Sequence, residues 1–127
     1  MELLYQASNS IISRDPETNI LFCTWIGPQN EKVLRQTGAK MRELFIEHRC
    51  TKILNDNTQV VGTWDHSTQW AAKEWFPAMI GIGLKKFAWV LATDVYAQVS
   101  AYRVSPGLDI VKNFISTEEA VKWLKQG

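Results

Sequence analysis

The sequence predicts a single-domain α/β fold with a mixed sheet, in which an antiparallel N-terminal hairpin precedes parallel βαβ crossovers. Three observations carry this prediction. The turn-forming segment Asp15–Asn19 separates two short apolar runs, as in a hairpin. A long amphipathic segment, residues 29–49, lies between two strand-like runs, an order that usually forms a parallel crossover. The apolar run over residues 86–92 is typical of a strand covered on both faces.

Length and composition predict one globular domain, residues 1–127. Hydrophobic residues make up 46% of the chain and charged residues 21%, which is not the composition of a disordered segment. The net charge of +1, without a long basic run, argues against nucleic acid as a partner. The apolar runs are too short for a membrane span, and the first residues lack a signal-peptide pattern. We therefore expect a cytoplasmic protein.

The N-terminal part is expected to form three strands and a long helix. Residues 3–5 and 10–13 are predicted as the first two strands, and residues 20–26, rich in β-branched and aromatic side chains, as the third. The helix over residues 29–49 has one apolar stripe, which consists of Leu34, Gly38, Met41, Phe45 and His48. Gly38 on that stripe indicates close packing against a sheet.

The middle of the chain is expected to continue with strand, loop and helix. A short strand over residues 51–55 precedes a loop or irregular extension over residues 56–66. The next helix, residues 72–82, has Asp65 or Ser67 as a candidate cap. It contains Pro77, which predicts a kink or two short helices.

The C-terminal part begins with the apolar run 86–92, our candidate for the centre of the sheet. A short helix is expected to start at Asp94, and residues 110–115 to form the last strand. Ser116 and Glu119 match a capping box. The final helix that follows is expected to bury Ala120, Val121 and Leu124.

Several short motifs accompany this order of elements. They are Ile53–Asn57, Trp64, Trp75-Phe76-Pro77, Gly83–Val90, and an ending with Phe114, Glu118-Glu119-Ala120 and Trp123-Leu124. In these features the chain resembles the small STAS domains, the fold of the bacterial anti-sigma-factor antagonists. More narrowly, it resembles an uncharacterised bacterial group described as STAS-like, SpoIIAA-like or CRAL-TRIO-like. The resemblance covers nearly the whole chain, and it implies the fold rather than an activity.

The phosphorylation motif of the true antagonists is missing. In those proteins a strand is followed by Asp-Ser-Ser-Gly at the start of a helix, and a partner kinase phosphorylates one Ser. The comparable stretches here are Asn55–Thr58 and Asp65–Thr68, and neither contains Ser-Ser-Gly. The resemblance therefore carries no phosphosite over. A phospho-regulated, antagonist-like switch that uses Thr58, Ser67 or Thr68 remains an alternative function.

Polar side chains gather where the strand after the long helix should end. They are Asn55, Asp56, Asn57 and Thr58. Ligands of open α/β sheets tend to bind outside the carboxyl ends of the strands, so these groups could hold a ligand or the backbone of a partner. The alternative is that the Asx residues close the strand end through local hydrogen bonds.

Tryptophan is abundant beside this polar stretch. The chain has six tryptophans, and Trp64, Trp70 and Trp75 fall close together. Aromatic side chains are enriched at binding surfaces, so these three could line a groove or an interface. The alternative, and the commoner arrangement in a small domain, is that they fill the core.

The sequence contains little that indicates a catalytic, metal or cofactor site. Asp65, His66 and Ser67 are adjacent, whereas catalytic triads are assembled from separated chain segments. The segment Gly81–Gly83 precedes a strand, the reverse of a dinucleotide site. Cys23 and Cys50 are expected to be buried thiols without metal-ligand spacing. We expect no metal and no cofactor, although a small enzyme of unknown reaction stays open as an alternative.

These features together predict a non-enzymatic binding domain with a regulatory role. The expected partner is a protein or a small apolar ligand, bound near residues 55–75. The N-terminal hairpin should leave a strand at the edge of the sheet, and exposed strand edges and aromatic side chains also allow a homodimer.

Overall fold

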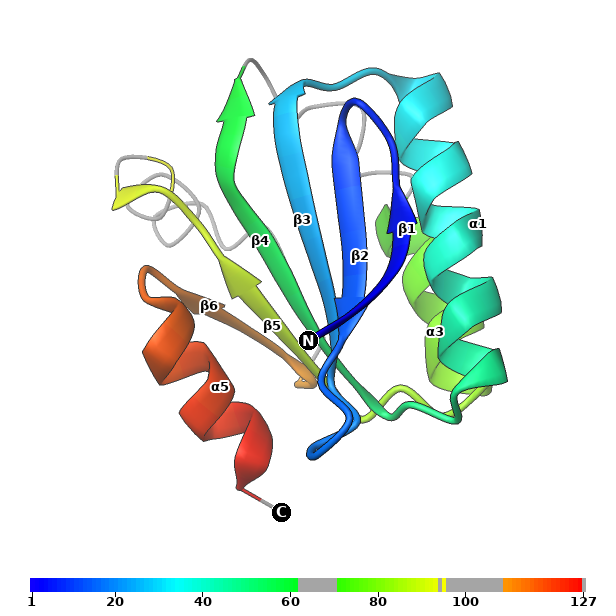
Figure 1. Cartoon of the computed structure of the whole chain (residues 1–127), viewed down its shortest axis with the longest axis vertical. Coiled ribbons are helices and arrows are strands. Elements are labelled where there is room, and N and C mark those ends of the chain that lie inside the picture. Colours follow the sequence, from blue (N-terminus) through cyan, green and yellow to red (C-terminus); the bar gives the residue numbers. More distant parts are fainter. Residues whose placement is uncertain (62–70, 94, 96–108, 127) are drawn as a thin grey trace.

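The computed structural model describes residues 1–61, 71–93, 95 and 109–126, and it shows one six-stranded mixed sheet with helices on both faces (Figure 1). The strands lie side by side in chain order: β1 (Glu2–Gln6), β2 (Ser10–Arg14), β3 (Leu21–Pro28), β4 (Lys52–Val61), β5 (Lys86–Val90) and β6 (Val111–Phe114). β1, β2 and β3 pair antiparallel, and β3 through β6 pair parallel. The predicted α/β fold with its N-terminal hairpin is confirmed.

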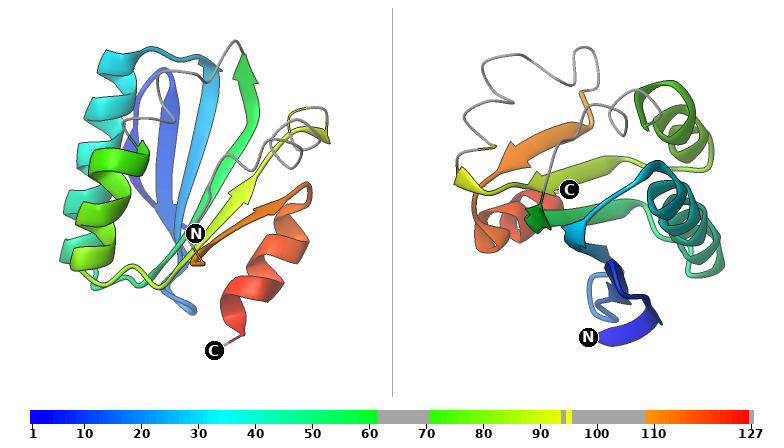
Figure 2. Two further views of the ribbon diagram at one scale, coloured as in Figure 1. Left: turned by 180° about the vertical axis from the view of Figure 1, so that it is seen from behind. Right: turned by 90° about the horizontal axis from the view of Figure 1, so that it is seen from above.

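The helices divide the interior into two layers of side chains. α1 (Glu31–Glu47) and α3 (Phe76–Gly81), the latter preceded by the π-helix η1 (Ala71–Trp75), lie on one face, and α5 (Thr117–Lys125) lies on the other (Figure 2). The α1 side has the larger core, whose buried members include Ile12, Leu21, Cys23, Ile53, Phe87, Met41, Phe45, Trp75, Phe76 and Met79. The α5 side has a smaller core, formed by Ile20, Leu54, Ala88, Val90, Phe114, Ala120 and Leu124.

β4 is longer than predicted, because its pairing with β3 continues beyond the polar residues. The sequence indicated a loop from Asp56 onward, yet the strand runs to Val61. Ile26, Gly27 and Pro28 of β3 lie opposite Gln59, Val60 and Val61, after a register shift in which β4 advances three residues, from Asp56 to Gln59, while β3 advances two, from Thr24 to Ile26. A neighbouring strand therefore overrode the loop-forming tendency of the Asx residues.

The predicted place of β5 at the centre of the sheet is wrong. β5 lies between β4 and the edge strand β6, and β3 and β4 are the middle pair. The apolar composition of β5 has a different cause, which is burial on both faces. Phe87 belongs to the core under α1 and α3, whereas Ala88 and Val90 belong to the core under α5.

The break expected around Pro77 is confirmed. The π-helix η1 ends at Trp75, and α3 begins at Phe76 with Pro77 in its first turn, where a missing N–H leaves no hydrogen bond unmade. The capping candidates Asp65 and Ser67 and the helix start at Asp94 lie outside the described residues.

Gly38 of α1 is buried, and its backbone is bound by an aromatic side chain. The backbone carbonyl of Gly38 accepts a 3.0 Å hydrogen bond from Nε1 of Trp75, which η1 brings to the helix. Both residues are buried. Trp75 is thus one neighbour of Gly38, and close packing of Gly38 against the sheet stays a prediction.

Side chains cap both ends of α1. The helix starts after Asn30, whose Oδ1 accepts from the backbone N–H of Val33 at 2.9 Å. It ends before Arg49, which has a positive φ of 55°. Asn19, in the β2–β3 turn, donates its side-chain amide to the carbonyls of His48 at 3.0 Å and Arg49 at 3.3 Å. The turn after α1 is thus tied to the turn before β3.

The serine of the predicted C-terminal capping box makes its expected hydrogen bond. Oγ of Ser116 accepts from the backbone N–H of Glu119 at 3.3 Å, and α5 follows directly. Of the three residues expected to be buried by this helix, Ala120 and Leu124 are buried and Val121 is half-buried.

We expect Met79→Ala to lower the free energy of unfolding by about 2–5 kcal/mol, because the fully buried thioether of α3 would leave a cavity. The neighbouring Ile80 is 43% exposed and provides the control, since Ile80→Ala should change the same quantity by about 0.5 kcal/mol or less. Urea unfolding followed by tryptophan fluorescence measures both. Equal losses in the two variants would contradict the orientation of α3 on the sheet.

Candidate functional site

The polar stretch predicted as a site lies within β4, so successive side chains alternate between the two faces of the sheet. Asn55 and Asn57 are buried, with exposed fractions of 7% and 5%. Asp56 is half-buried and Thr58 is exposed. The four candidate residues therefore separate into an internal pair and an external pair.

The internal pair forms a hydrogen-bonded chain with a tryptophan of the neighbouring strand. Nε1 of Trp25 donates to Oδ1 of Asn55 at 2.7 Å, and Nδ2 of Asn55 donates to Oδ1 of Asn57 at 3.0 Å. Buried amides that lack partners are costly, and these contacts offset that cost. Asn55 and Asn57 thus stabilise the core. Their partner Trp25, in β3, could not be predicted from residue spacing in the sequence.

The external pair is ordered by its own contacts. Oδ1 of Asp56 accepts from both the backbone N–H of Thr58, at 2.9 Å, and its hydroxyl group, at 2.7 Å. Thr58 therefore lies within a strand with its hydroxyl engaged, and not at the start of a helix as the phosphorylated serine of the antagonists does. Ser67 and Thr68, the other residues named for a switch, lie outside the described residues.

Trp75 fills the core. Its side chain is 8% exposed, and its ring makes edge-to-face contacts with Phe76 and Phe87, at centroid distances of 5.0 and 5.8 Å. Such contacts stabilise the interior beyond the area they bury. Trp64 and Trp70, the other two tryptophans predicted to line a site, lie outside the described residues.

The end of β4 has a feature that the sequence did not indicate. β4 pairs with β5 only as far as Asp56, which lies opposite Val90, whereas its pairing with β3 continues to Val61. Residues Asn57–Val61 therefore project past β5, and we call them the β4 overhang (Figure 1). Among the described residues, no strand pairs with its β5 side.

The two thiols are poorly suited to nucleophilic chemistry. Burial raises the pKa of Cys23 far above its ordinary value, and the nearby carboxylate of Asp56 raises it further. Burial also raises the pKa of Cys50, and the Arg14 guanidinium opposes that change in part. Within the described ranges, no group of three or more His, Cys, Asp or Glu side chains could hold a metal ion.

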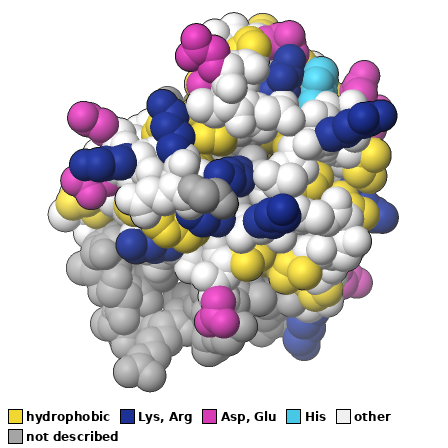
Figure 3. All heavy atoms as spheres, turned by 90° about the horizontal axis from the view of Figure 1, so that it is seen from below, with side chains coloured by type: hydrophobic (Ala, Val, Ile, Leu, Met, Phe, Trp, Pro, Cys, Tyr) yellow, Lys and Arg dark blue, Asp and Glu magenta, His cyan; other side chains and the backbone are white. Residues whose placement is uncertain are grey.

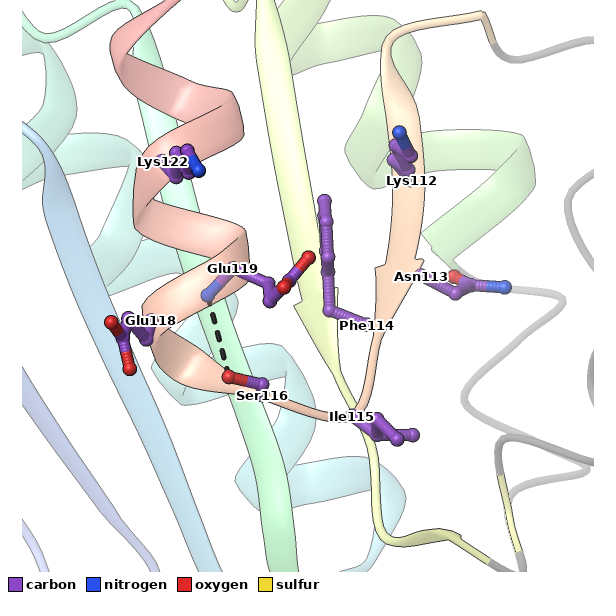
Figure 4. Close-up of a pocket in the computed structure, with 8 residues that line it drawn as sticks. All are labelled: Lys112, Asn113, Phe114, Ile115, Ser116, Glu118, Glu119 and Lys122. Carbon is purple, nitrogen blue, oxygen red and sulfur yellow. Dashed lines mark hydrogen bonds between the residues drawn. The ribbon is translucent and has the colours of Figure 1, made fainter.

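A surface pocket of about 620 Å³ lies between β6 and the first turns of α5. Lys112 and Lys122 stand on either side of it, with Phe114 and Glu119 between them (Figure 4). Glu118 also lines it, so the two ammonium groups are matched by two carboxylates. The sequence indicated only the capping box at this position, because the pocket forms between a strand and a helix that pack side by side.

Comparison with known proteins gives a likeness of fold. No protein-family model matches the chain, and no curated protein matches it. A solved structure from Shewanella loihica PV-4 is similar to it, with a TM-score of 0.59 and 19% sequence identity over 95% of this chain and 98% of that one. That protein is described as an uncharacterised member of the DUF3478 family with a SpoIIAA-like fold.

The STAS-like resemblance drawn from the sequence is therefore confirmed for the fold. This chain has a SpoIIAA-like α/β fold, and the Shewanella loihica protein with the similar structure is described as uncharacterised. None of the helices in the described part of the chain is long and apolar enough to cross a membrane.

We expect Asn55→Leu to lower the free energy of unfolding by about 2–3 kcal/mol, because it leaves the indole N–H of Trp25 and Oδ1 of Asn57 without their hydrogen-bond partner. Thr58→Val, on the exposed face, is the control and should cost about 1 kcal/mol or less. A double-mutant cycle with Trp25→Phe tests the pairing itself. Strictly additive losses would show that the two side chains do not interact.

We expect stability to fall at alkaline pH, partly through Cys23. Because its folded pKa is raised, the folded protein keeps a proton that the unfolded chain releases. This contribution is complete below the ordinary thiol pKa of 9.0 and is lost as the pH rises above it, by about 1.4 kcal/mol per pH unit. Urea unfolding between neutral and alkaline pH should show a shallower decline in Cys23→Ala. Identical slopes would refute the shifted pKa.

Proposed function

We propose that this SpoIIAA-like domain is a non-enzymatic, regulatory protein-binding module, whose partner adds an extended segment alongside the β4 overhang. The observation that carries the proposal is the difference in pairing along β4. Its β3 side is paired to Val61, whereas among the described residues its β5 side is paired only to Asp56.

Backbone chemistry supports strand addition at this position. A strand that is paired on one side presents N–H and C=O groups on the other, and an extended peptide can satisfy them. The overhang also lies at the carboxyl end of the parallel strands, where α/β sheets usually bind their ligands. Main-chain hydrogen bonds would supply affinity here, and side chains would supply specificity.

The side chains of the overhang favour a protein over a small apolar ligand. Thr58, Gln59 and Val61 of this strand are exposed, Val61 by 65%. A small apolar ligand needs apolar walls that enclose most of its surface. A peptide needs only an accessible strand edge with a mixture of polar and apolar contacts, such as the carboxylate of Asp56, held by Thr58, and the side chain of Val61.

We expect a photo-crosslinking amino acid at position 61 to capture a discrete protein in cells of the native organism. The same amino acid in place of Lys32, exposed on α1, is the control and should not capture that protein. With the crosslinking amino acid kept at position 61, Thr58→Lys combined with Gln59→Lys, both at exposed positions, should reduce capture about tenfold, because charged side chains block strand addition. Mass spectrometry identifies the adduct.

Three results would argue against the proposal. One is the same crosslinked protein from positions 61 and 32, which would indicate unspecific capture. Another is a small-molecule adduct at position 61, which would indicate the apolar ligand. The third is a phosphorylated residue within 58–68 on which capture depends, which would indicate the antagonist-like switch.

A further inference from the structure

The fold gathers basic side chains at the edge of the sheet opposite the β4 overhang. Parallel strands begin at this edge, and α1 and α5 end at it (Figure 1). We call the group the basic edge; its members are Arg49, Lys52, Lys85, Lys86 and Lys125. In Figure 3, which views the molecule from below, Lys and Arg side chains occupy the middle of the face and acidic side chains stand nearer its rim.

Two of these lysines are direct neighbours. Lys52 of β4 lies opposite Lys86 of β5, and the backbone N–H of Lys85 donates to the carbonyl of Thr51 at 2.8 Å. Like charges on adjacent strands destabilise a sheet. An anion bound near them would relieve this repulsion.

Lys86 is held in place by α5. Its Nζ lies 4.9 Å from the centre of the Trp123 ring and donates to the carbonyl of Trp123 at 3.0 Å and to that of Gln126. A cation at the end of a helix is favourable, so its position has a structural reason. Lys86 nevertheless remains opposite Lys52, and it takes part in none of the ion pairs between described residues.

In the described part of the chain, no ion pair includes the other members of the basic edge, although a backbone hydrogen bond from Glu17 and, to a smaller extent, the charge of Lys125 lower the pKa of the Asp15 carboxyl. The ion pairs there join Arg14 to Glu2, Arg35 to Glu31 and Glu74, and Lys40 to Glu43. None of them includes Arg49, Lys52, Lys85 or Lys125. Within the described residues, the charges of Arg49, Lys52 and Lys85 are therefore available to a partner.

Arg49 occupies a position where glycine is usual. It follows α1 with a φ of 55°, in the left-handed region that L side chains rarely adopt. The amide of Asn19 supports this conformation by donating to the carbonyl of Arg49. Since glycine would adopt the turn without strain, the local backbone gives no reason for an arginine here, which points to a use for its charge.

We propose that the basic edge docks a short acidic segment of a protein partner. Acidic side chains stand nearer the rim of this face (Figure 3). They would repel a long polyanion such as a nucleic acid duplex, or an anionic bilayer, that extends past the patch. A segment with a few carboxylates fits within the rim. This surface is distinct from the β4 overhang, so either proposal can fail alone.

A binding measurement on the whole chain tests this assignment. The probe is a fluorescein-labelled peptide of alternating Glu and Ser, followed by anisotropy. Lys52→Glu combined with Lys85→Glu should weaken binding about tenfold or more, because two attractions become repulsions. The matched control, Lys32→Glu combined with Lys73→Glu, changes the net charge equally at exposed positions of α1 and η1. It should weaken binding by about twofold at most.

Arg49→Gly separates a binding role from a structural one. It should weaken binding several-fold while leaving the thermal unfolding midpoint unchanged or higher, because glycine relieves the positive φ. A lower midpoint with unchanged binding would overturn the role given to Arg49. Equal weakening in both double variants would overturn the site. Tighter binding of a DNA duplex or of phosphatidylserine vesicles than of the peptide would overturn the acidic segment as its occupant.

Discussion

The 2.7 Å hydrogen bond between the indole of Trp25 and the amide of Asn55 joins the two middle strands of the sheet in the interior of the protein. Asn55 in turn donates to Asn57, so three polar side chains satisfy one another under α1 and α3. Because a strand alternates its faces, fixing Asn55 and Asn57 inward turns Asp56 and Thr58 outward. The arrangement of the candidate site follows from this one buried contact.

Parallel pairing gives the sheet two chemically different edges. At the carboxyl edge, β4 continues beside β3 after its ladder with β5 has ended, so that among the described residues no strand pairs with the β5 side of Asn57–Val61. At the amino edge, the starts of β4 and β5 and the ends of α1 and α5 bring basic side chains together. The same sheet therefore has two different surfaces at opposite ends of its parallel strands. One is suited to bind a partner through main-chain hydrogen bonds, and the other is suited to bind a partner through charge.

Most of the elements could be predicted from the sequence, because their signals are local. The turn at Asp15–Asn19, the helical spacing from Leu34 to Phe45, the break at Pro77 and the cap at Ser116 each depend on residues a few positions apart. The STAS-like resemblance rests on the order of these elements, and the fold likeness to the Shewanella loihica protein agrees with it. The candidate site was predicted less well, since the inward direction of Asn55 depends on Trp25, thirty positions away.

The sequence by itself determined which segments are strands and helices and that they form an α/β domain, since periodicity, turns and caps are properties of neighbouring residues. Only the tertiary structure decided how far β4 extends, because a strand ends where its partner does. It also decided that β5 lies near an edge, and that Arg49, Lys52, Lys85 and Lys125 lie where strands start and helices end, at the same edge of the sheet (Figure 1). Charges spread over some seventy-five positions of an almost neutral chain become a patch only when strand starts and helix ends meet.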